Sequence, residues 1–217
     1  MIEIPIHDAK GKQVDTLKVD EQLLGGEVRP GLLKQAYVRY HANRRIGSAA
    51  TRNRSQTSFS TRKLYRQKGT GNARRGSAGT NLMRSGGHAF AKRARSFRQA
   101  MPVKMRRLAN RNALLAKAVD GEIKLLDKID FKKPSTQKFN AILKNLNIDR
   151  SCLVALSNVT GHEARSAQNI ETISLTQIDR LNAFDLLNHR YLLVDKASLQ
   201  SWLDRAKEQA GERKEGH

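Results

Sequence analysis

The chain has 217 residues, of which 41 are Lys or Arg and 20 are Asp or Glu, so its formal net charge is +21. It has no apolar run near the roughly 18 residues of a membrane span, and its single cysteine, Cys152, excludes an internal disulfide. The N-terminal MIEIPIHDAKG has no long apolar core of a secretory signal, and the histidines lack metal-ligand spacing, so we expect a soluble, cytoplasmic protein without cofactor or metal.

The excess of positive charge is confined to one block of the sequence. Residues 28–119 contain 23 Lys and Arg and no Asp or Glu, whereas the residues on either side together carry a net charge of −2. A solvated surface usually mixes both signs, because like charges repel one another. The block therefore predicts a polyanion as the binding partner.

A hairpin and two helices are predicted around this block. The N-terminal IEIPIHDAKGKQVDTLKV indicates a small hairpin that turns at about Lys10–Lys12. A helix with an apolar stripe is predicted to begin at Pro30 and to end before Gly47, and a second is predicted from near Pro102 to Gly121.

Residues 47–101 show no convincing helix or strand pattern. They are rich in Gly, Ser, Thr and Asn and have few large apolar residues, so they cannot build a core of their own. A stretch of this length without structure is usually functional or disordered. We therefore expect one globular domain, formed by about residues 1–46 and 102–210, with an inserted extended basic loop at 47–101 and a disordered tail at 211–217.

Within this loop, RQKGTGNARRGS (Arg66–Ser77) has the glycines and cations of a phosphate-binding loop. Gly71 and Gly76 have the spacing of a nucleotide-binding loop, but Ser77 stands where that motif requires Lys, and no apolar strand precedes the stretch. Arg74 likewise replaces the third glycine of the dinucleotide pattern. The motif therefore favours the phosphates of a polymer, and a nucleotide-dependent enzyme remains the alternative.

The C-terminal half alternates short apolar runs with helical patterns. Strands are predicted at Glu122–Asp127, Cys152–Ser157, Glu171–Leu175 and Arg190–Asp195. Helices are predicted in STQKFNAILKNL, which has Ser135 as a candidate cap, and in HEARSAQN, LNAFDLLNH and SLQSWLDRAK. This alternation predicts a three-layer α/β/α domain with a mostly parallel four-stranded sheet, and the N-terminal hairpin is predicted as a separate element.

The composition of the loop favours RNA as the polyanion. Arg pairs with phosphate and stacks on bases, and Phe59, Tyr65, Phe90 and Phe97 are interleaved with the cations. A membrane surface would favour an amphipathic helix, and duplex DNA would require a base-reading element such as a zinc finger. We expect a non-enzymatic RNA-binding protein, with a non-specific nucleic-acid chaperone as the alternative.

Several runs resemble the bacterial form of the ribosomal protein L-four family over essentially the whole chain, notably ANRRIGSAATRNRSQ, RQKGTGNARRGS, RSGGHAF, VKMRRLANRNALLAK and AFDLLNHRYLLV. The resemblance implies a structural constituent of the large ribosomal subunit that binds its rRNA and neighbouring ribosomal proteins and supports assembly. It also implies that the loop reaches the polypeptide exit tunnel and forms its constriction with ribosomal protein L-twenty-two, beside the nascent polypeptide.

By this resemblance, the loop tip comprises Arg66, Gln67, Lys68, Gly69 and Thr70, and a change at Lys68 is expected to alter the macrolide response. The block and the resemblance together predict these rRNA contacts: Arg44, Arg45, Arg52, Arg54, Arg62, Lys63, Arg66, Lys68, Arg74, Arg75, Arg84, Lys92, Arg93, Arg95, Arg98, Lys104, Arg106 and Arg107. The sequence departs from the usual family pattern at Leu64, Tyr65, Asn72, Gly79, Asn81 and Met83.

Overall fold

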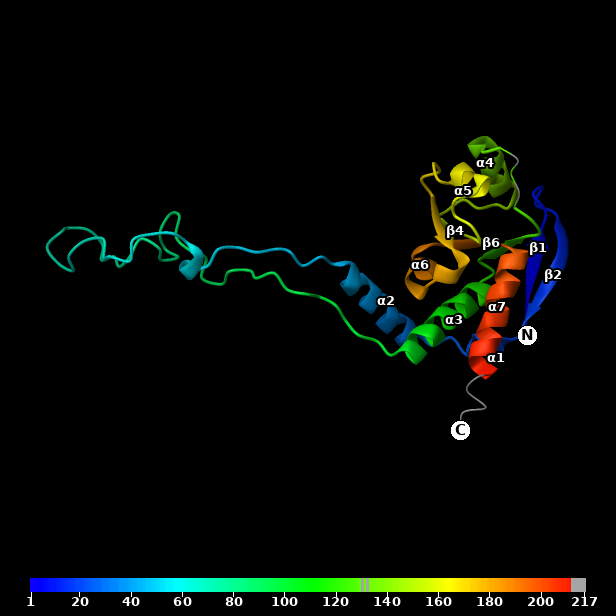
Figure 1. The fold of residues 1–217 in the computed structure, drawn as a ribbon, viewed down its shortest axis with the longest axis horizontal. Coiled ribbons are helices and arrows are strands. Elements are labelled where there is room, and N and C mark those ends of the chain that lie inside the picture. The colour runs from blue at the N-terminus through cyan, green and yellow to red at the C-terminus, as the bar shows by residue number, and fades with distance from the viewer. Residues whose placement is uncertain (130, 132, 212–217) are drawn as a thin grey trace. The chain divides into compact units, whose positions relative to one another are not determined.

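The computed structural model describes residues 1–129, 131 and 133–211 (Figure 1). The chain divides into two compact units: one is formed by residues 1–41 together with the described residues from 100 onward, and the other by residues 42–99. The first unit holds the β-sheet and both hydrophobic clusters. None of the described helices is both long and apolar enough to cross a membrane.

The sheet has six strands, where four and a separate hairpin were predicted. The strands are β1 (Ile2–His7), β2 (Gln13–Val19), β3 (Ile123–Leu126), β4 (Cys152–Leu156), β5 (Ile173–Gln177) and β6 (Tyr191–Asp195). Their order is β2-β1-β3-β6-β4-β5, and all neighbouring pairs are parallel except the β1–β2 hairpin. The α/β class is confirmed, and the four predicted strands are its β3, β6, β4 and β5.

The N-terminal hairpin joins the sheet through β1. Ile6 of β1 is in parallel register with Leu125 of β3, and the N–H of Asp127 donates to the carbonyl of His7 at 3.0 Å. Ile4 and Ile6 are 4% and 1% exposed, so one face of β1 is as buried as a central strand. Burial of this face accounts for the pairing, which the local hairpin pattern could not reveal because β3 lies more than a hundred residues later.

Helices cover both faces of the sheet, as the three-layer prediction requires. One hydrophobic cluster contains Leu192 and Val194 of β6, and the other contains Leu193, because successive strand residues point to opposite faces. The first cluster is completed by α1 (Glu21–Leu24), α2 (Pro30–Arg44), α3 (Val103–Val119), α6 (Ala183–Asn188) and α7 (Lys196–Gly211). The second is completed by α4 (Thr136–Asn145) and α5 (His162–Ala167).

The helix boundaries follow local signals that were read correctly from the sequence. Pro30 opens α2, the Ser135 hydroxyl accepts from the N–H of Lys138 to cap α4, and Gly121 follows α3 with a φ of 67°. Two short elements of the first unit were not predicted: α1, capped by the Asp20 carboxylate, and the 3₁₀ turn η2 (Ile178–Arg180). The predicted tail begins at Gly211, the last residue of α7, and its remainder lies outside the described residues.

Candidate nucleic-acid interface

The second unit, residues 42–99, contains no Asp or Glu. Its backbone runs out and back as an irregular hairpin, and the joining hydrogen bonds, each 3.0 or 3.1 Å long, pair Gly47 with Arg95, Thr51 with Lys92, Arg52 with His88, and Leu64 with Gly76. These bonds are too widely spaced to form a strand within residues 42–99, apart from an isolated bridge between Asn53 and His88. Most backbone groups of the unit are thus left for other partners.

One short helical turn, which was not predicted from the sequence, interrupts the hairpin. The 3₁₀ helix η1 (Arg54–Gln56) is closed by a capping box, in which the Asn53 side chain accepts from the N–H of Gln56 and the Gln56 side chain accepts from the N–H of Asn53. The Asn-x-x-Gln spacing was a visible signal for this turn. It fixes the backbone direction of Arg54.

Residues 66–70 lie where the two sides of the hairpin meet. Gly69 and Gly71 have φ values of 79° and 70°, a left-handed conformation that glycine adopts without strain. The Arg66 guanidinium donates to the carbonyl of Gly69 at 2.8 Å, so this predicted rRNA contact also closes its own turn. The Lys68 side chain is exposed and has no partner in the second unit.

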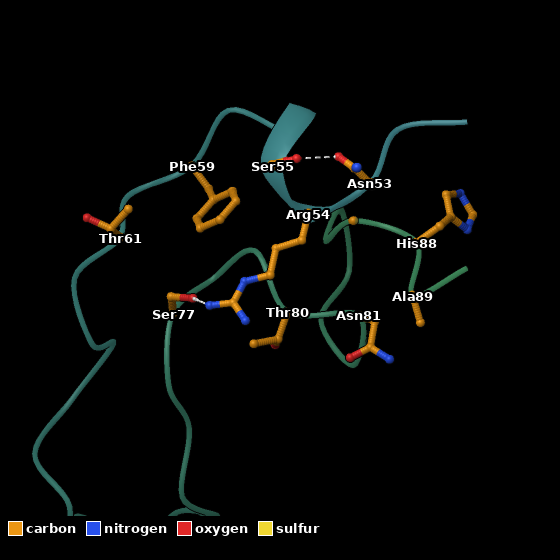
Figure 2. Close-up of a pocket in the computed structure, with 11 residues that line it drawn as sticks. Asn53, Arg54, Ser55, Phe59, Thr61, Ser77, Thr80, Asn81, His88 and Ala89 are labelled. Atoms are coloured by element: carbon orange, nitrogen blue, oxygen red, sulfur yellow. Dashed lines mark hydrogen bonds between the residues drawn. The ribbon is translucent and has the colours of Figure 1, made fainter. Parts of the chain in front are cut away.

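A cavity of about 640 Å³ lies between the two sides of the hairpin, next to η1 (Figure 2). The Arg54 side chain runs between Phe59 and Thr80, and its guanidinium donates to the Ser77 hydroxyl at 3.5 Å. Gly79 lies against Phe59, which lines this cavity, and a Cβ at Gly79 would lie 2.1 Å from the Phe59 ring. Glycine at position 79 therefore permits the Phe59 ring to pack against the backbone.

Most of the predicted rRNA contacts are exposed to solvent. Fifteen of the eighteen lie in the second unit, and the other three, Lys104, Arg106 and Arg107, lie on the first turns of α3. All eighteen side chains are exposed except Arg75 and Arg106, which are half-buried. With no carboxylate among residues 42–99, the cations of the second unit present one sign of charge.

Not every cation of the block belongs to this surface. Lys117 near the end of α3 is buried and forms an ion pair with Glu122, and its ammonium also donates to the carbonyl of Arg190 at 2.8 Å. The Arg111 guanidinium donates to the carbonyl of Leu23 at 3.4 Å. The helical period turns both side chains inward, to partners within the first unit. The 23 cations counted in the sequence therefore overstate the charge that a partner could meet.

The aromatic residue Phe97, which the sequence places among the cations of the loop, contacts two arginine side chains. The guanidinium carbons of Arg45 and Arg95 lie 3.9 and 4.6 Å from the centre of its ring. A second cavity of about 670 Å³ is lined by Arg45, Lys92, Arg93, Arg95 and Phe97, together with Gly47 and small neighbours. No local sequence signal predicts this cluster, because it depends on pairing between residues about fifty positions apart.

The model of the ribosomal protein L4/L1 family matches residues 17–205 of the chain. The chain belongs to this family. Three relatives called large ribosomal subunit protein uL4 are 36% identical in Dehalococcoides mccartyi, 38% in Moorella thermoacetica and 36% in Rhodopirellula baltica. The alignments cover 92%, 90% and 96% of this chain and 95%, 95% and 92% of the respective relatives. The likeness to the L4/L1 family thus extends over both units and includes the whole basic block.

Proposed function

We propose that this protein is a non-enzymatic structural constituent of the large ribosomal subunit that binds the subunit's rRNA through the second unit and the first turns of α3. The observation that carries the proposal is the set of exposed cations on a unit without any carboxylate, in a chain of the ribosomal L4/L1 family. Such a unit repels itself unless a polyanion supplies the opposite charge. Its relatives in three bacteria bear the name of a large-subunit protein.

The domain organisation belongs to the same proposal. Residues 1–46 and 102–210 form the globular domain, and residues 47–101 form an inserted loop that orders on rRNA. The loop lacks the apolar residues of a core, and its few cross-bonds leave its backbone open to nucleic acid. Arg66–Thr70 form the tip, which lines the exit-tunnel constriction with ribosomal protein L-twenty-two and borders the path of the nascent polypeptide.

Binding to large-subunit rRNA at several salt concentrations tests the main proposal. If a third of the block's cations each neutralise one phosphate, log Kd changes with log salt with a slope of magnitude roughly 5, at about 0.7 per contact for single strands. Co-sedimentation with large subunits is the second readout. A flat salt dependence, or absence from the large subunit, would refute the proposal.

Cross-linking within assembled ribosomes tests the loop tip. A photoreactive residue at position 68 should cross-link to nascent chains, whereas the same residue at the exposed position Lys18 on β2 should not. Equal nascent-chain cross-linking from both positions would contradict the tip assignment. It would leave rRNA binding itself standing.

A non-specific nucleic-acid chaperone is the second candidate, because the second unit, apart from the end of α2 and the single turn η1, has no helix or strand with which to read bases. This function predicts equal affinity for duplex DNA and rRNA at the same salt concentration. The structural role predicts a preference for large-subunit rRNA that survives an excess of duplex DNA. A competition titration separates the two.

A further inference from the structure

Arg45 and Arg95 share one aromatic ring. Their guanidinium carbons lie 3.9 and 4.6 Å from the centre of the Phe97 ring, so they are no more than 8.5 Å apart, which is the sum of the two distances. Two positive charges at this separation repel each other, and the negative face of an aromatic ring attracts both. The Phe97 ring therefore holds together two cations that would otherwise move apart.

The backbone around this cluster is fixed independently of the two arginines. The N–H of Arg95 donates to the carbonyl of Gly47 at 3.1 Å, and the N–H of Gln99 donates to the Asn43 side chain at 2.7 Å. Gly47 has a φ of 74°, and a Cβ there would lie 2.1 Å from the carbonyl oxygen of Arg95 and 3.0 Å from the Phe97 ring. Only glycine fits this position, so the backbone at Gly47 packs directly against Arg95 and the Phe97 ring.

The charges at this place have no internal counter-ion in residues 42–99. Lys92 and Arg93 line the same cavity of about 670 Å³, which places four cationic side chains around one hollow. All four are exposed, while the Phe97 ring is half-buried. The missing partner must therefore carry negative charge and reach two guanidinium groups at once.

Phosphodiester groups meet these requirements best. A guanidinium offers a planar fork of donors that matches the oxygens of a phosphate, and two forks held close together suit one phosphate or two consecutive phosphates of a strand. An acidic protein segment would satisfy the charge of this cluster. It would not satisfy the cations that continue along the rest of the second unit, which favours a long, regularly charged polymer.

We propose that Phe97 is a positioning residue that holds Arg45 and Arg95 as a clamp for consecutive phosphates of an RNA strand. The inference rests on the proposed function, because large-subunit rRNA is the ligand that the clamp would hold. The arginines supply the charge and the ring supplies their geometry. Loss of the ring should therefore weaken RNA binding although the net charge of the protein is unchanged.

The test compares three variants of the full-length protein in rRNA binding across salt concentrations. Phe97→Leu should raise Kd about 5- to 30-fold at 0.15 M salt, for two exposed cation–π contacts, and reduce the slope magnitude by up to about 1.4, for two phosphate contacts. Phe97→Tyr keeps the aromatic face and should bind like the wild type. Leu82→Ala is the control, because Leu82 is an exposed apolar residue of the same unit that lines neither of the two cavities, and it should change Kd less than twofold.

A double-mutant cycle separates positioning from general support of the fold. In an Arg45→Gln/Arg95→Gln background, Phe97→Leu should have no further effect on Kd, because the ring acts only through the two guanidiniums. An undiminished effect in that background would overturn the proposal, as would wild-type binding by Phe97→Leu or equal losses in Phe97→Leu and Leu82→Ala. Stronger binding of an acidic peptide than of rRNA at this site would also overturn it.

The wild-type control distinguishes the two levels of inference. If the unmodified protein binds rRNA steeply with salt and Phe97→Leu binds with the same Kd and the same slope, the clamp is wrong and the proposed function stands. If the unmodified protein shows no salt-dependent rRNA binding, the proposed function fails, and the clamp fails with it. Circular dichroism and thermal unfolding of each variant verify that the first unit remains folded.

Discussion

Replacing Glu122 with Gln is expected to destabilise the first unit strongly, because two cations converge on this buried carboxylate. Glu122 directly precedes β3 and is 7% exposed; it pairs with the ammonium of Lys117, and the Nε of Arg190 lies 2.7 Å from its other oxygen. The substitution conserves shape and removes only the charge. It leaves the Lys117 side chain, which is 10% exposed, as a buried cation without a carboxylate.

The structure sets the size and the order of the effects. Breaking a buried ion pair from one side costs about 3–5 kcal/mol, which for a protein of this size is a fall in Tm of about 6–20 °C. Lys117→Met should lower the free energy of unfolding by less, about 1–3 kcal/mol, because the Glu122 carboxylate keeps its ion pair with Arg190. The Arg190 side chain is half-exposed, so water solvates the rest of its charge. The double variant Lys117→Met/Glu122→Gln should recover part of the loss, since no buried charge remains unpaired.

Thermal and urea unfolding, followed by circular dichroism, measure these differences. Glu3→Gln is the matched control, because it breaks an ion pair with Lys18 in which both side chains are more than 60% exposed, and it should cost less than about 1 kcal/mol. A Glu122→Gln loss no larger than that of Glu3→Gln would refute the reasoning. So would a Lys117→Met variant less stable than Glu122→Gln.

Three further predictions concern other parts of the chain. Deleting residues 55–90 should leave a cooperatively unfolding first unit, since both hydrophobic clusters lie outside that span, and a broad, non-cooperative melt would contradict this. Gly11→Ala should lower the free energy of unfolding in urea more than Gly26→Ala does. Both glycines have a positive φ, but only a Cβ at Gly11 would meet a neighbour, the Asn145 carbonyl oxygen at 2.3 Å. Equal losses would contradict this steric explanation. Burial raises the pKa of the Cys152 thiol to about 12, so alkylation at pH 8 should be negligible until urea unfolds the protein. The free energy of unfolding should also fall as pH rises from about 9 to 12, because over this range the thiol loses its proton in the unfolded chain but keeps it in the folded one.

The sequence predicted the longer helices and the strands β3, β4, β5 and β6 because their signals are local. The apolar stripe and the Ser135 cap of α4 lie within a single segment. The apolar run of β4 and the glycine that follows α3 are likewise visible in the residues of those elements alone. The edge strand β5 was placed less accurately, since it spans Ile173–Gln177 and lies two residues later than predicted. Its residues are only partly buried, so its apolar signal in the sequence is weaker. The inclusion of the N-terminal hairpin in the sheet was missed, since it depends on a contact between β1 and β3.

The sequence by itself determined the chemistry of this protein: an acid-free block of 92 residues, a family resemblance, and a core pattern outside that block. Only the tertiary structure decided which of those charges face outward. It turned Lys117 inward to Glu122 and brought Arg45 and Arg95 to one ring. The physical reason is that charge is a property of each residue, whereas burial and charge pairing depend on residues that only the folded chain brings together.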